Sequence, residues 1–361
     1  MTGQHRIVVL GAGYAGLAAA RRLVPTARDA HITVVDARAS FVERVRLHQY
    51  GAGQSIPEWD LRELLEPKRI HFVQASAQAI EHKRVILDGA PDVEYDSLIY
   101  ALGSTNDPGV QGVAECAYSV ATPEDSEYLR TSIPVGRVVV VGGGATGIEL
   151  AAELAESRPD SRVLLLGSDE PASWLSARAR DHVRRTLERL GVEIRSDAKV
   201  IEVTPESVRL ADGSVVEAAA TVWTAGFGVP ELARRSGLAV DGHGRVLTDE
   251  TLRSISHPDV YAAGDAAVIA GPGGRELRMA CATALPTGKY AADAVVARLA
   301  GRAPRELRFR YFFQCISLGR RDGVIQFLHA DDSPGRTVLT GRTAAWFKEQ
   351  IVRGAAGAAR P

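Results

Sequence analysis

Two glycine-rich loops contain the residues of this chain whose types and spacing are best suited to chemistry. Both loops, at 11–16 and at 142–147, follow the pattern G-x-G-x-x-G. The first glycine of this pattern permits a tight turn, the second lets the main chain approach a pyrophosphate, and the third allows helix and strand to pack closely. The two loops therefore predict two dinucleotide sites, each with a pyrophosphate at a helix N-terminus.

The residue that would hold the adenosine ribose differs between the two repeats. Asp36 ends the strand after the first loop, 25 residues beyond Gly11, where a carboxylate accepts hydrogen bonds from both ribose hydroxyls. The same count from Gly142 reaches Gly167, which Ser168 follows. The second site therefore lacks the carboxylate that would repel a 2′-phosphate.

We expect this second site to take either NADH or NADPH, with NADPH slightly favoured. Arg178 or Arg180 would then hold the 2′-phosphate, whereas Asp169 is placed to reach back to the ribose instead. The sequence leaves these alternatives open.

The elements around the loops predict an α/β protein with two Rossmann-like βαβ domains and a small C-terminal β-rich interface segment. Apolar runs at 6–10 and 137–141 predict the strands before the loops, and an alanine-rich helix pattern follows each loop. The predicted ranges are 1–106 with 255–303 for the first, discontinuous domain, 107–254 for the inserted second domain, and 304–361 for the C-terminal segment.

Composition narrows the possible partners. The chain has 361 residues and a net charge of −1, and its arginines form no stripe, so no nucleic-acid partner is expected. The three cysteines, Cys116, Cys281 and Cys315, lack the spacing of a zinc site, so no metal is expected, and they suggest a reducing, cytoplasmic setting. No apolar run reaches 18 residues, so at most peripheral membrane contact is expected.

The C-terminus is predicted to form a short helix at 343–353. Trp346, Phe347, Gln350 and Ile351 lie on one stripe of this helix, which we expect to pack against its own domain, the alternatives being a dimer or a membrane contact. The last residues, 354–361, are expected to fray.

Five motifs occur in the order found in two-dinucleotide-binding flavoproteins: GAGYAG, LIYALGS, GGGATGIELAAELA, WTAGFG and VYAAGD. Over nearly its whole length the chain resembles type II NADH dehydrogenases and apoptosis-inducing-factor-like proteins, which belong to the pyridine nucleotide-disulfide oxidoreductase superfamily. The resemblance implies FAD in the first unit, NAD(P)H in the second, and hydride transfer from the nicotinamide to flavin N5.

The resemblance also implies roles for single residues. Glu149 would lie beside the nicotinamide, although an acid early in a helix is also favoured by the helix dipole alone. The catalytic residues expected on this basis are Glu149, Thr283 and Thr287. The expected cofactor-binding residues are Gly11, Gly13, Tyr14, Ala15, Gly16, Asp36, Ala37, Arg46, Ala101, Gly103, Gly142, Gly144, Thr146, Gly147, Gly226, Gly264, Asp265, Ala284 and Leu285.

The chain departs from its resembled families in three places. The redox cysteine pair of disulfide reductases is missing, and Thr283 and Thr287 replace both glutamines of the stretch AQxxxQG of type II NADH dehydrogenases. The C-terminal helix is also shorter than their membrane anchor. These departures concern the acceptor side of the reaction rather than the cofactors.

The function predicted is that of an FAD-dependent NAD(P)H oxidoreductase that passes electrons to a quinone or quinone-like small molecule, as a monomer or homodimer. The alternatives are a ferredoxin- or rubredoxin-type reductase, a biosynthetic tailoring flavoenzyme, and a slow-turnover redox-sensing flavoprotein.

Overall fold

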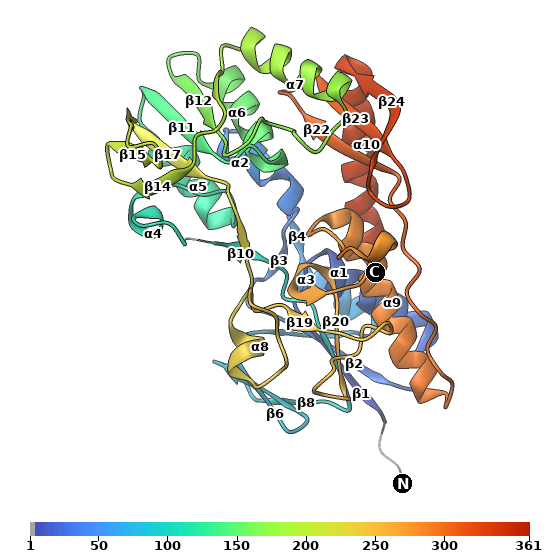
Figure 1. Ribbon diagram of the computed structural model, residues 1–361. Helices are drawn as coiled ribbons and strands as arrows, with labels where there is room; N and C mark the ends of the chain where they lie inside the picture. Colours follow the sequence, from blue (N-terminus) through green and yellow to red (C-terminus); the bar gives the residue numbers. More distant parts are fainter. Residues whose placement is uncertain (1–3, 108) are drawn as a thin grey trace.

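The first dinucleotide unit is built on a parallel five-stranded sheet. The computed structural model describes residues 4–107 and 109–361 (Figure 1). In spatial order the strands are β20 (Val260–Ala262), β9 (Ser97–Tyr100), β1 (Arg6–Leu10), β2 (His31–Asp36) and β5 (His71–Gln74). Helix α1 (Tyr14–Thr26) connects β1 to β2 and packs against α9 (Cys281–Leu299). The strand that returns late in the chain, β20, makes this unit discontinuous.

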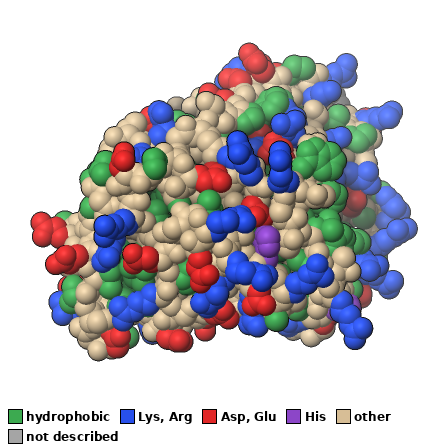
Figure 2. Space-filling view, turned by 90° about the horizontal axis from the view of Figure 1, so that it is seen from above, with side chains coloured by type: hydrophobic (Ala, Val, Ile, Leu, Met, Phe, Trp, Pro, Cys, Tyr) green, Lys and Arg blue, Asp and Glu red, His purple; other side chains and the backbone are tan. Residues whose placement is uncertain are grey.

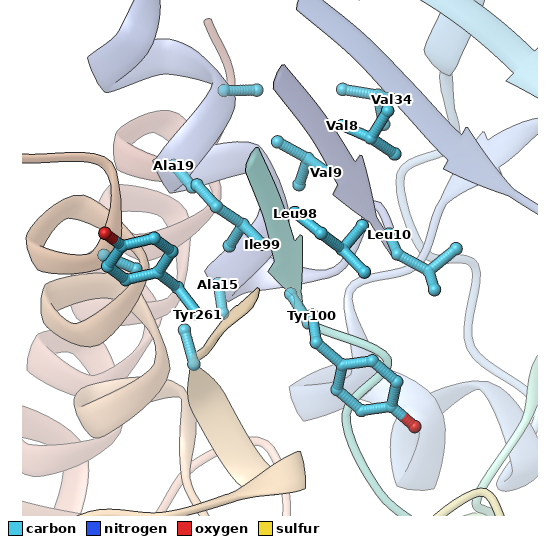
Figure 3. Packing of buried hydrophobic residues seen from close by; sticks show 14 of the residues in the cluster. Val8, Val9, Leu10, Ala15, Ala19, Val34, Leu98, Ile99, Tyr100 and Tyr261 are labelled. Atoms are coloured by element: carbon cyan, nitrogen blue, oxygen red, sulfur yellow. The ribbon is translucent and has the colours of Figure 1, made fainter. Parts of the chain in front are cut away.

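The centre of this sheet is buried on both faces. Residues 7–10 of β1 are at most 1% exposed. Figure 3 shows Val8, Val9 and Leu10 beside Leu98 and Ile99 of the neighbouring strand. The sheet shares one core with α1 and α9 and with the antiparallel strands β6 (Ser76–Glu81), β7 (Arg84–Asp88) and β8 (Val93–Glu94). Burial on both faces is why its strands are continuous apolar runs rather than alternating ones.

The second unit repeats this arrangement. Its parallel sheet has the order β13 (Glu193–Arg195), β12 (Arg162–Leu166), β11 (Arg137–Val141) and β17 (Ala220–Trp223). Helix α6 (Ala145–Ser157) joins β11 to β12, and α7 (Ala177–Arg189) precedes β13. An antiparallel sheet of β14 (Val200–Val203), β15 (Ser207–Leu210) and β16 (Val215–Glu217) completes the unit. The two units confirm the predicted α/β fold class.

Two adjacent segments carry the chain between the units. Strand β10 (Thr105–Asn106) leads into the second unit and pairs antiparallel with β18 (Phe227–Gly228), which leads out of it. After β18, helix α8 (Leu232–Arg235) and β19 (Val246–Leu247) pack in the core of the first unit. The predicted ranges grouped these short elements with the second domain, because a four-residue helix and a two-residue strand give no periodic pattern that assigns them to a core.

The C-terminal segment lies against both units. It consists of an antiparallel sheet of β22 (Phe313–Ser317), β23 (Gly323–Leu328) and β24 (Pro334–Thr340), followed by α10 (Gly341–Ala359). In Figure 1 the long red helix runs down one side of the molecule, from the second unit to α1 of the first. The predicted β-rich segment is thus confirmed.

Helix α10 is longer and better anchored than predicted. Its buried stripe is Ala344, Lys348, Val352, Ala356 and Ala359. Arg21 of α1 donates to the carbonyl oxygen of Gly357 at 2.6 Å, and the guanidinium of Arg360 stacks 3.5 Å from the ring centroid of Trp59. The prediction that 354–361 frays is therefore wrong, because small alanine side chains let this end pack closely against α1.

Only part of the stripe predicted to pack inward does so. Trp346 is 63% exposed, Gln350 is exposed, and Phe347 and Ile351 are half-buried. Phe347 packs edge-on against Phe313 of β22, with 6.2 Å between the ring centroids. The prediction that this stripe packs against its own domain is therefore wrong for Trp346 and Gln350 and confirmed for Phe347. The smaller stripe with Lys348 is the buried one, since a charged residue in its centre hid it from a hydrophobicity pattern.

The remaining elements are short. They are β3 (Ser40–Phe41), α2 (Leu47–Gly51), β4 (Trp59–Asp60), α3 (Leu61–Leu65), β6 (Ser76–Glu81), β7 (Arg84–Asp88), β8 (Val93–Glu94), α4 (Val113–Cys116), α5 (Pro123–Ser132) and β21 (Ala267–Val268). None of the described helices combines the length and apolarity needed to cross a membrane.

Candidate active site

The first glycine loop has the backbone geometry of a dinucleotide cradle. Gly11 has φ +102°, and a Cβ there would lie 2.4 Å from the carbonyl oxygen of Ala101. A Cβ on Gly16 would lie 1.8 Å from the carbonyl oxygen of Gly11, so α1 packs on β1 only with glycine here. A Cβ on Gly13, by contrast, would meet nothing within 4 Å. The loop is therefore tightly packed at Gly11 and Gly16 and open at Gly13, where a pyrophosphate would approach the start of α1.

Asp36 reaches back from the end of β2 to this loop. One carboxylate oxygen accepts from the N–H of Ala12 at 2.6 Å, and the other accepts from the N–H of Arg38 at 2.9 Å. These bonds hold the carboxylate at the rim of the cradle, where ribose hydroxyls would meet it.

A second acid lies deep on the other side of the cradle. Ser104 donates to Asp265 Oδ2 at 2.7 Å, and Arg44 donates to the carbonyl oxygen of Ser104 at 2.6 Å. Burial raises the pKa of Asp265, while Ser104 and Arg44 oppose that rise. Among the described residues, Asp265 Oδ1 is buried without a hydrogen-bond partner. Such an orphaned acceptor fits a hydroxyl-rich ligand, as the ribityl chain of FAD is.

Arg44, and not the predicted Arg46, is the arginine at this cradle. The Arg46 guanidinium donates to Glu43 at 2.8 Å and makes two bonds to Glu349 of α10, at 3.0 and 2.9 Å. With its donors occupied in this way, Arg46 connects the first unit to α10. Sequence position alone could not separate two arginines only two residues apart.

The hydroxyl groups of the two threonines of α9 donate hydrogen bonds to main-chain carbonyl oxygens. Thr283 donates to the carbonyl oxygens of Arg278 and Ala280, both at 2.7 Å. Thr287 is fully buried, donates to the Thr283 carbonyl oxygen at 2.8 Å, and accepts from the N–H of Gly264 at 3.1 Å. Both hydroxyls therefore hold the start of α9 and the Gly264–Asp265 turn in place.

Close packing of α9 on α1 depends on a glycine that the predictions did not single out. A Cβ on Gly288 would lie 2.0 Å from the carbonyl oxygen of Ala15. Gly264, with φ +71°, lies against Ala15 in the same way, at 3.0 Å between Cβ positions. The small residues predicted around this cradle thus share one contact region between the two helices.

The second glycine loop repeats the geometry of the first. Gly142 has φ +126°, and a Cβ on Gly147 would lie 1.9 Å from the Gly142 carbonyl oxygen. Gly144, like Gly13, has open space where its Cβ would be. The N-terminus of α6 therefore presents a second open cradle for a pyrophosphate.

Four buried polar residues from separate parts of the chain meet beside α6. Glu149 Oε1 accepts from the N–H of Ser317 at 2.9 Å and forms an ion pair with Lys348 of α10. Lys348 also donates to Ser317 Oγ at 3.1 Å, and His48 of α2 lies 3.7 Å from Glu149 Oε2. We call Glu149, Lys348, Ser317 and His48 the buried quartet. Each is at most 8% exposed.

Burial dominates the protonation of the quartet's two bases. It lowers the pKa of Lys348 to about 7, with Arg46 adding to the effect and Glu349 opposing it. It also lowers the pKa of His48 well below its usual value, and Lys348, Arg320 and Arg46 reinforce this. His48 is therefore neutral near pH 7, whereas Lys348 can exchange a proton there. Sequence analysis found Glu149 but not its partners, which lie far away along the chain.

The other predicted site residues lie along the loops already described. Gly226, with φ +80°, follows β17, and its Cβ would lie 3.2 Å from that of Asp107. The first turns of α1, α6 and α9 contain Tyr14, Ala15, Thr146, Ala284 and Leu285, whereas Ala37 follows β2, and Ala101 and Gly103 follow β9. Cys281 and Cys315 are unpaired, and burial raises their pKa values to about 11 and about 12. Across 4–107 and 109–361, no group of three or more His, Cys, Asp and Glu side chains is arranged to hold a metal ion.

Two open glycine cradles at the starts of two βαβ helices, with an acid on the ribose side of the first, define an oxidoreductase fold for two dinucleotides. The pyridine nucleotide-disulphide oxidoreductase family matches residues 5–288, so the chain belongs to this family. The chain is thus an oxidoreductase of a family whose cofactors are FAD and NAD(P)H.

Relatives in this family include proteins named for quinone reduction. The chain is 31% identical to an NADH dehydrogenase-like protein of Mycobacterium tuberculosis, over 96% of this chain and 92% of that one. It is 26% identical to a demethylphylloquinone reductase of Synechocystis, over 95% and 92%. It is also 28% identical to a type II NADH:quinone oxidoreductase of Mycobacterium tuberculosis, over 86% and 76%.

Solved structures share the fold at low sequence identity. A sulfide:quinone oxidoreductase from Aquifex aeolicus superposes with a TM-score of 0.83 at 19% identity, covering 97% of this chain and 90% of that one. The structure of NDH2 from Plasmodium falciparum in complex with NADH gives 0.82 at 16% identity, covering 96% and 94%. The resemblance inferred from the five sequence motifs is therefore confirmed.

Proposed function

We propose that this chain catalyses the reduction of a quinone by NAD(P)H: NAD(P)H, one proton and a quinone give NAD(P)+ and a hydroquinone. The observation that carries the proposal is the position of Glu149 in α6, the helix that starts at the second cradle. Its fifth residue, Glu149, contacts a lysine with a pKa of about 7. A quinone takes up protons together with electrons, so an acid–base pair near the nicotinamide end of such a helix suits this acceptor.

The residues of the first cradle would hold FAD. Gly13 would face the pyrophosphate, Asp36 the adenosine ribose, and Asp265 Oδ1 a ribityl or pyrophosphate-side hydroxyl. Bound FAD would supply the two-electron carrier between nicotinamide and quinone. Arg44 and Ser104 would act by holding Asp265 in position.

The second cradle would hold NAD(P)H, with Gly144 facing its pyrophosphate. Glu149 and Lys348 would exchange protons in a space that bulk water does not reach, because each is at most 8% exposed. Thr283 and Thr287, expected to be catalytic, are better suited to positioning, since both hydroxyl protons are bound to carbonyl oxygens.

The setting we propose is the cytoplasm, with peripheral contact to the membrane in which quinones dissolve and without a nucleic-acid partner. Residues 304–361 carry ten Lys and Arg against five Asp and Glu, although the whole chain has a net charge of −1. Trp346 and Phe312 of this segment are 63% and 59% exposed. On the right of Figure 2, the side of the C-terminal segment in Figure 1, basic and hydrophobic side chains lie together. Such a face suits an anionic lipid surface, and a monomer or homodimer would present it.

The domain assignment we propose follows the packing. An FAD domain would comprise 1–106 with 229–303, an NAD(P)H domain 107–228, and the C-terminal segment 304–361. The change from the predicted 254/255 boundary rests on α8 and β19, which pack in the first core.

Stopped-flow absorbance at 450 nm under anaerobic conditions tests the proposed reaction in two halves. NADH or NADPH should bleach the bound flavin, and a short-chain quinone should restore its colour. The Lys348→Met variant should keep the first rate within about fivefold and slow the second by about a hundredfold, as loss of a general acid–base group does.

Glu156→Gln on the same helix is the matched control, because Glu156 accepts only from the exposed N–H of Arg320 at 2.8 Å. It should change neither rate. A flavin that neither nucleotide bleaches would refute the proposed function. Reoxidation that is fast with a ferredoxin and negligible with quinones would refute the quinone assignment alone.

A further inference from the structure

NADPH differs from NADH by a phosphate on the 2′ position of the adenosine ribose, and in the second unit the residue expected to face this ribose is a glycine. Gly167 directly follows β12, at the position that Asp36 occupies in the first unit. Its N–H donates to the carbonyl oxygen of Arg195 at 3.1 Å, and its own carbonyl oxygen accepts from the N–H of Ala198 at 2.8 Å. The residue is therefore held on both sides by main-chain bonds.

No side chain fits at this position. A Cβ on Gly167 would lie 2.6 Å from the carbonyl oxygen of Asp169, a main-chain atom of the same turn. The same Cβ would lie only 3.6 Å from the N of Gly143 in the glycine loop. In the first unit, the Asp36 carboxylate fills the corresponding space and accepts from the N–H of Ala12 at 2.6 Å. In the second unit this space is lined by main chain and stays free of a carboxylate from β12.

The charges nearest this turn are one unpaired acid, Asp169, and a cluster of one glutamate and two arginines whose formal charge is +1. Asp169 is exposed and accepts from Ser168 Oγ at 3.2 Å, and it forms no ion pair with any residue in the described part of the chain. Glu170, the next residue, pairs with Arg184 at 2.8 Å and with Arg180 at 3.8 Å. Arg180, one of the two arginines expected to hold the 2′-phosphate, therefore belongs to this cluster around Glu170.

We infer that the second site binds NADPH as well as NADH, with Asp169 as the residue that limits NADPH binding and Arg184 as the cation that favours it. This inference rests on the proposed function, because it assumes that the second cradle holds a nicotinamide dinucleotide. The physical reason is that a 2′-phosphate adds negative charge beside a turn with no fixed carboxylate. It meets repulsion from an exposed, unpaired acid, and attraction from Arg184 in a surface cluster that has one more arginine than glutamate.

The test measures binding of the oxidised nucleotides, which needs no turnover. Quenching of tryptophan fluorescence in the FAD-loaded protein gives Kd for NAD+ and NADP+ at low and at moderate salt. We expect the two Kd values to agree within about tenfold, and the Kd of NADP+ to rise more steeply with salt because the extra charge is screened.

Two variants assign the residues. Asp169→Asn should tighten NADP+ by about fivefold and Arg184→Gln should weaken it by about fivefold, a size typical of single charges acting through solvent. Both should leave the Kd of NAD+ within twofold. Asp88→Asn, which removes an exposed charge from the first unit, is the control and should change neither Kd.

The outcomes separate this inference from the proposed function. NADP+ bound more than a hundredfold weaker than NAD+, or variants that leave the ratio unchanged, would overturn the inference while the proposed reaction stood. If neither nucleotide bound to a folded, FAD-loaded protein, the proposed function would fail as well.

Discussion

Replacing Lys348 with methionine isolates the contribution of the charge in the buried quartet. Methionine keeps much of the length of the lysine stem but removes the ammonium group from Glu149 and Ser317. In the variant, Glu149 keeps the N–H of Ser317 at 2.9 Å and the neutral His48 at 3.7 Å. A buried carboxylate would thus lose its only countercharge within this group.

Two opposing effects set the size of the loss. Lowering the pKa of Lys348 from 10.5 to about 7 means that its charged form costs about 5 kcal/mol to bury. Removing one partner of a buried ion pair costs about 3–5 kcal/mol even after the saved burial cost is included, because the other charge stays buried without its partner. Since the pKa of Lys348 is about 7, only about half of these side chains are charged at pH 7, and we expect Lys348→Met and Glu149→Gln each to lower the free energy of unfolding by about 2–3 kcal/mol. The double variant, which buries neither charge, should lose less than the sum by about 2 kcal/mol.

Urea unfolding of the FAD-loaded proteins at pH 7 measures all four corners of this double-mutant cycle. Asp293→Asn provides the control, because Asp293 pairs with Arg22 at the surface with both side chains 46% exposed, and it should cost less than about 1 kcal/mol. Losses that add within 0.5 kcal/mol would show that Glu149 and Lys348 do not interact in the folded protein, and the acid–base pair proposed for quinone reduction would fall with them.

The remaining predictions concern pH, the C-terminus, the helix contact and the thiols. Between pH 7 and 10.5 the unfolded chain binds the proton that folded Lys348 releases, so wild-type stability should rise with pH relative to Lys348→Met in urea titrations. Deleting 354–361 should cost about 2 kcal/mol in the same assay, since the deletion removes buried alanines and an arginine stacked on an indole. Gly288→Val should cost about 3 kcal/mol and lower the FAD content of the purified protein, because α9 must move away from α1. Iodoacetamide at pH 8 should modify Cys281 and Cys315 much more slowly in the native protein than after unfolding, because their raised pKa values leave little thiolate; rapid labelling of the native protein, followed by mass spectrometry, would contradict this.

Features that depend on local backbone geometry could be predicted from the sequence. A Cβ on Gly16 would meet the carbonyl oxygen of Gly11 in the same loop, so the spacing of the loop already contains the constraint. The same holds for the second loop, where a Cβ on Gly147 would lie 1.9 Å from the Gly142 carbonyl oxygen. These patterns predicted the fold class and both cradles.

Features that depend on distant partners could not be predicted in this way. Lys348 follows Glu149 by 199 residues, and only the folded C-terminal segment brings the two together. The buried face of α10 carries a lysine and small alanines, so a hydrophobicity pattern selected the opposite face with Trp346. Arg44 and Arg46 have the same side chain in the same short segment, and their roles differ only because Glu349 is beside one of them.

The C-terminal segment therefore does more than cover the two units, because it contributes polar residues to both of them. It supplies Ser317 and Lys348 to the quartet beside the second cradle, and Glu349 to Arg46 of the first unit. Each of these polar contacts joins parts of the chain that lie far apart in the sequence; those of Ser317 and Lys348 are buried, and that of Glu349 is partly buried. A segment that only shielded the flavin would need apolar residues at these positions, because unpaired buried charge is costly. These polar contacts are explained if the C-terminal segment also supplies the groups through which protons reach the proposed acceptor.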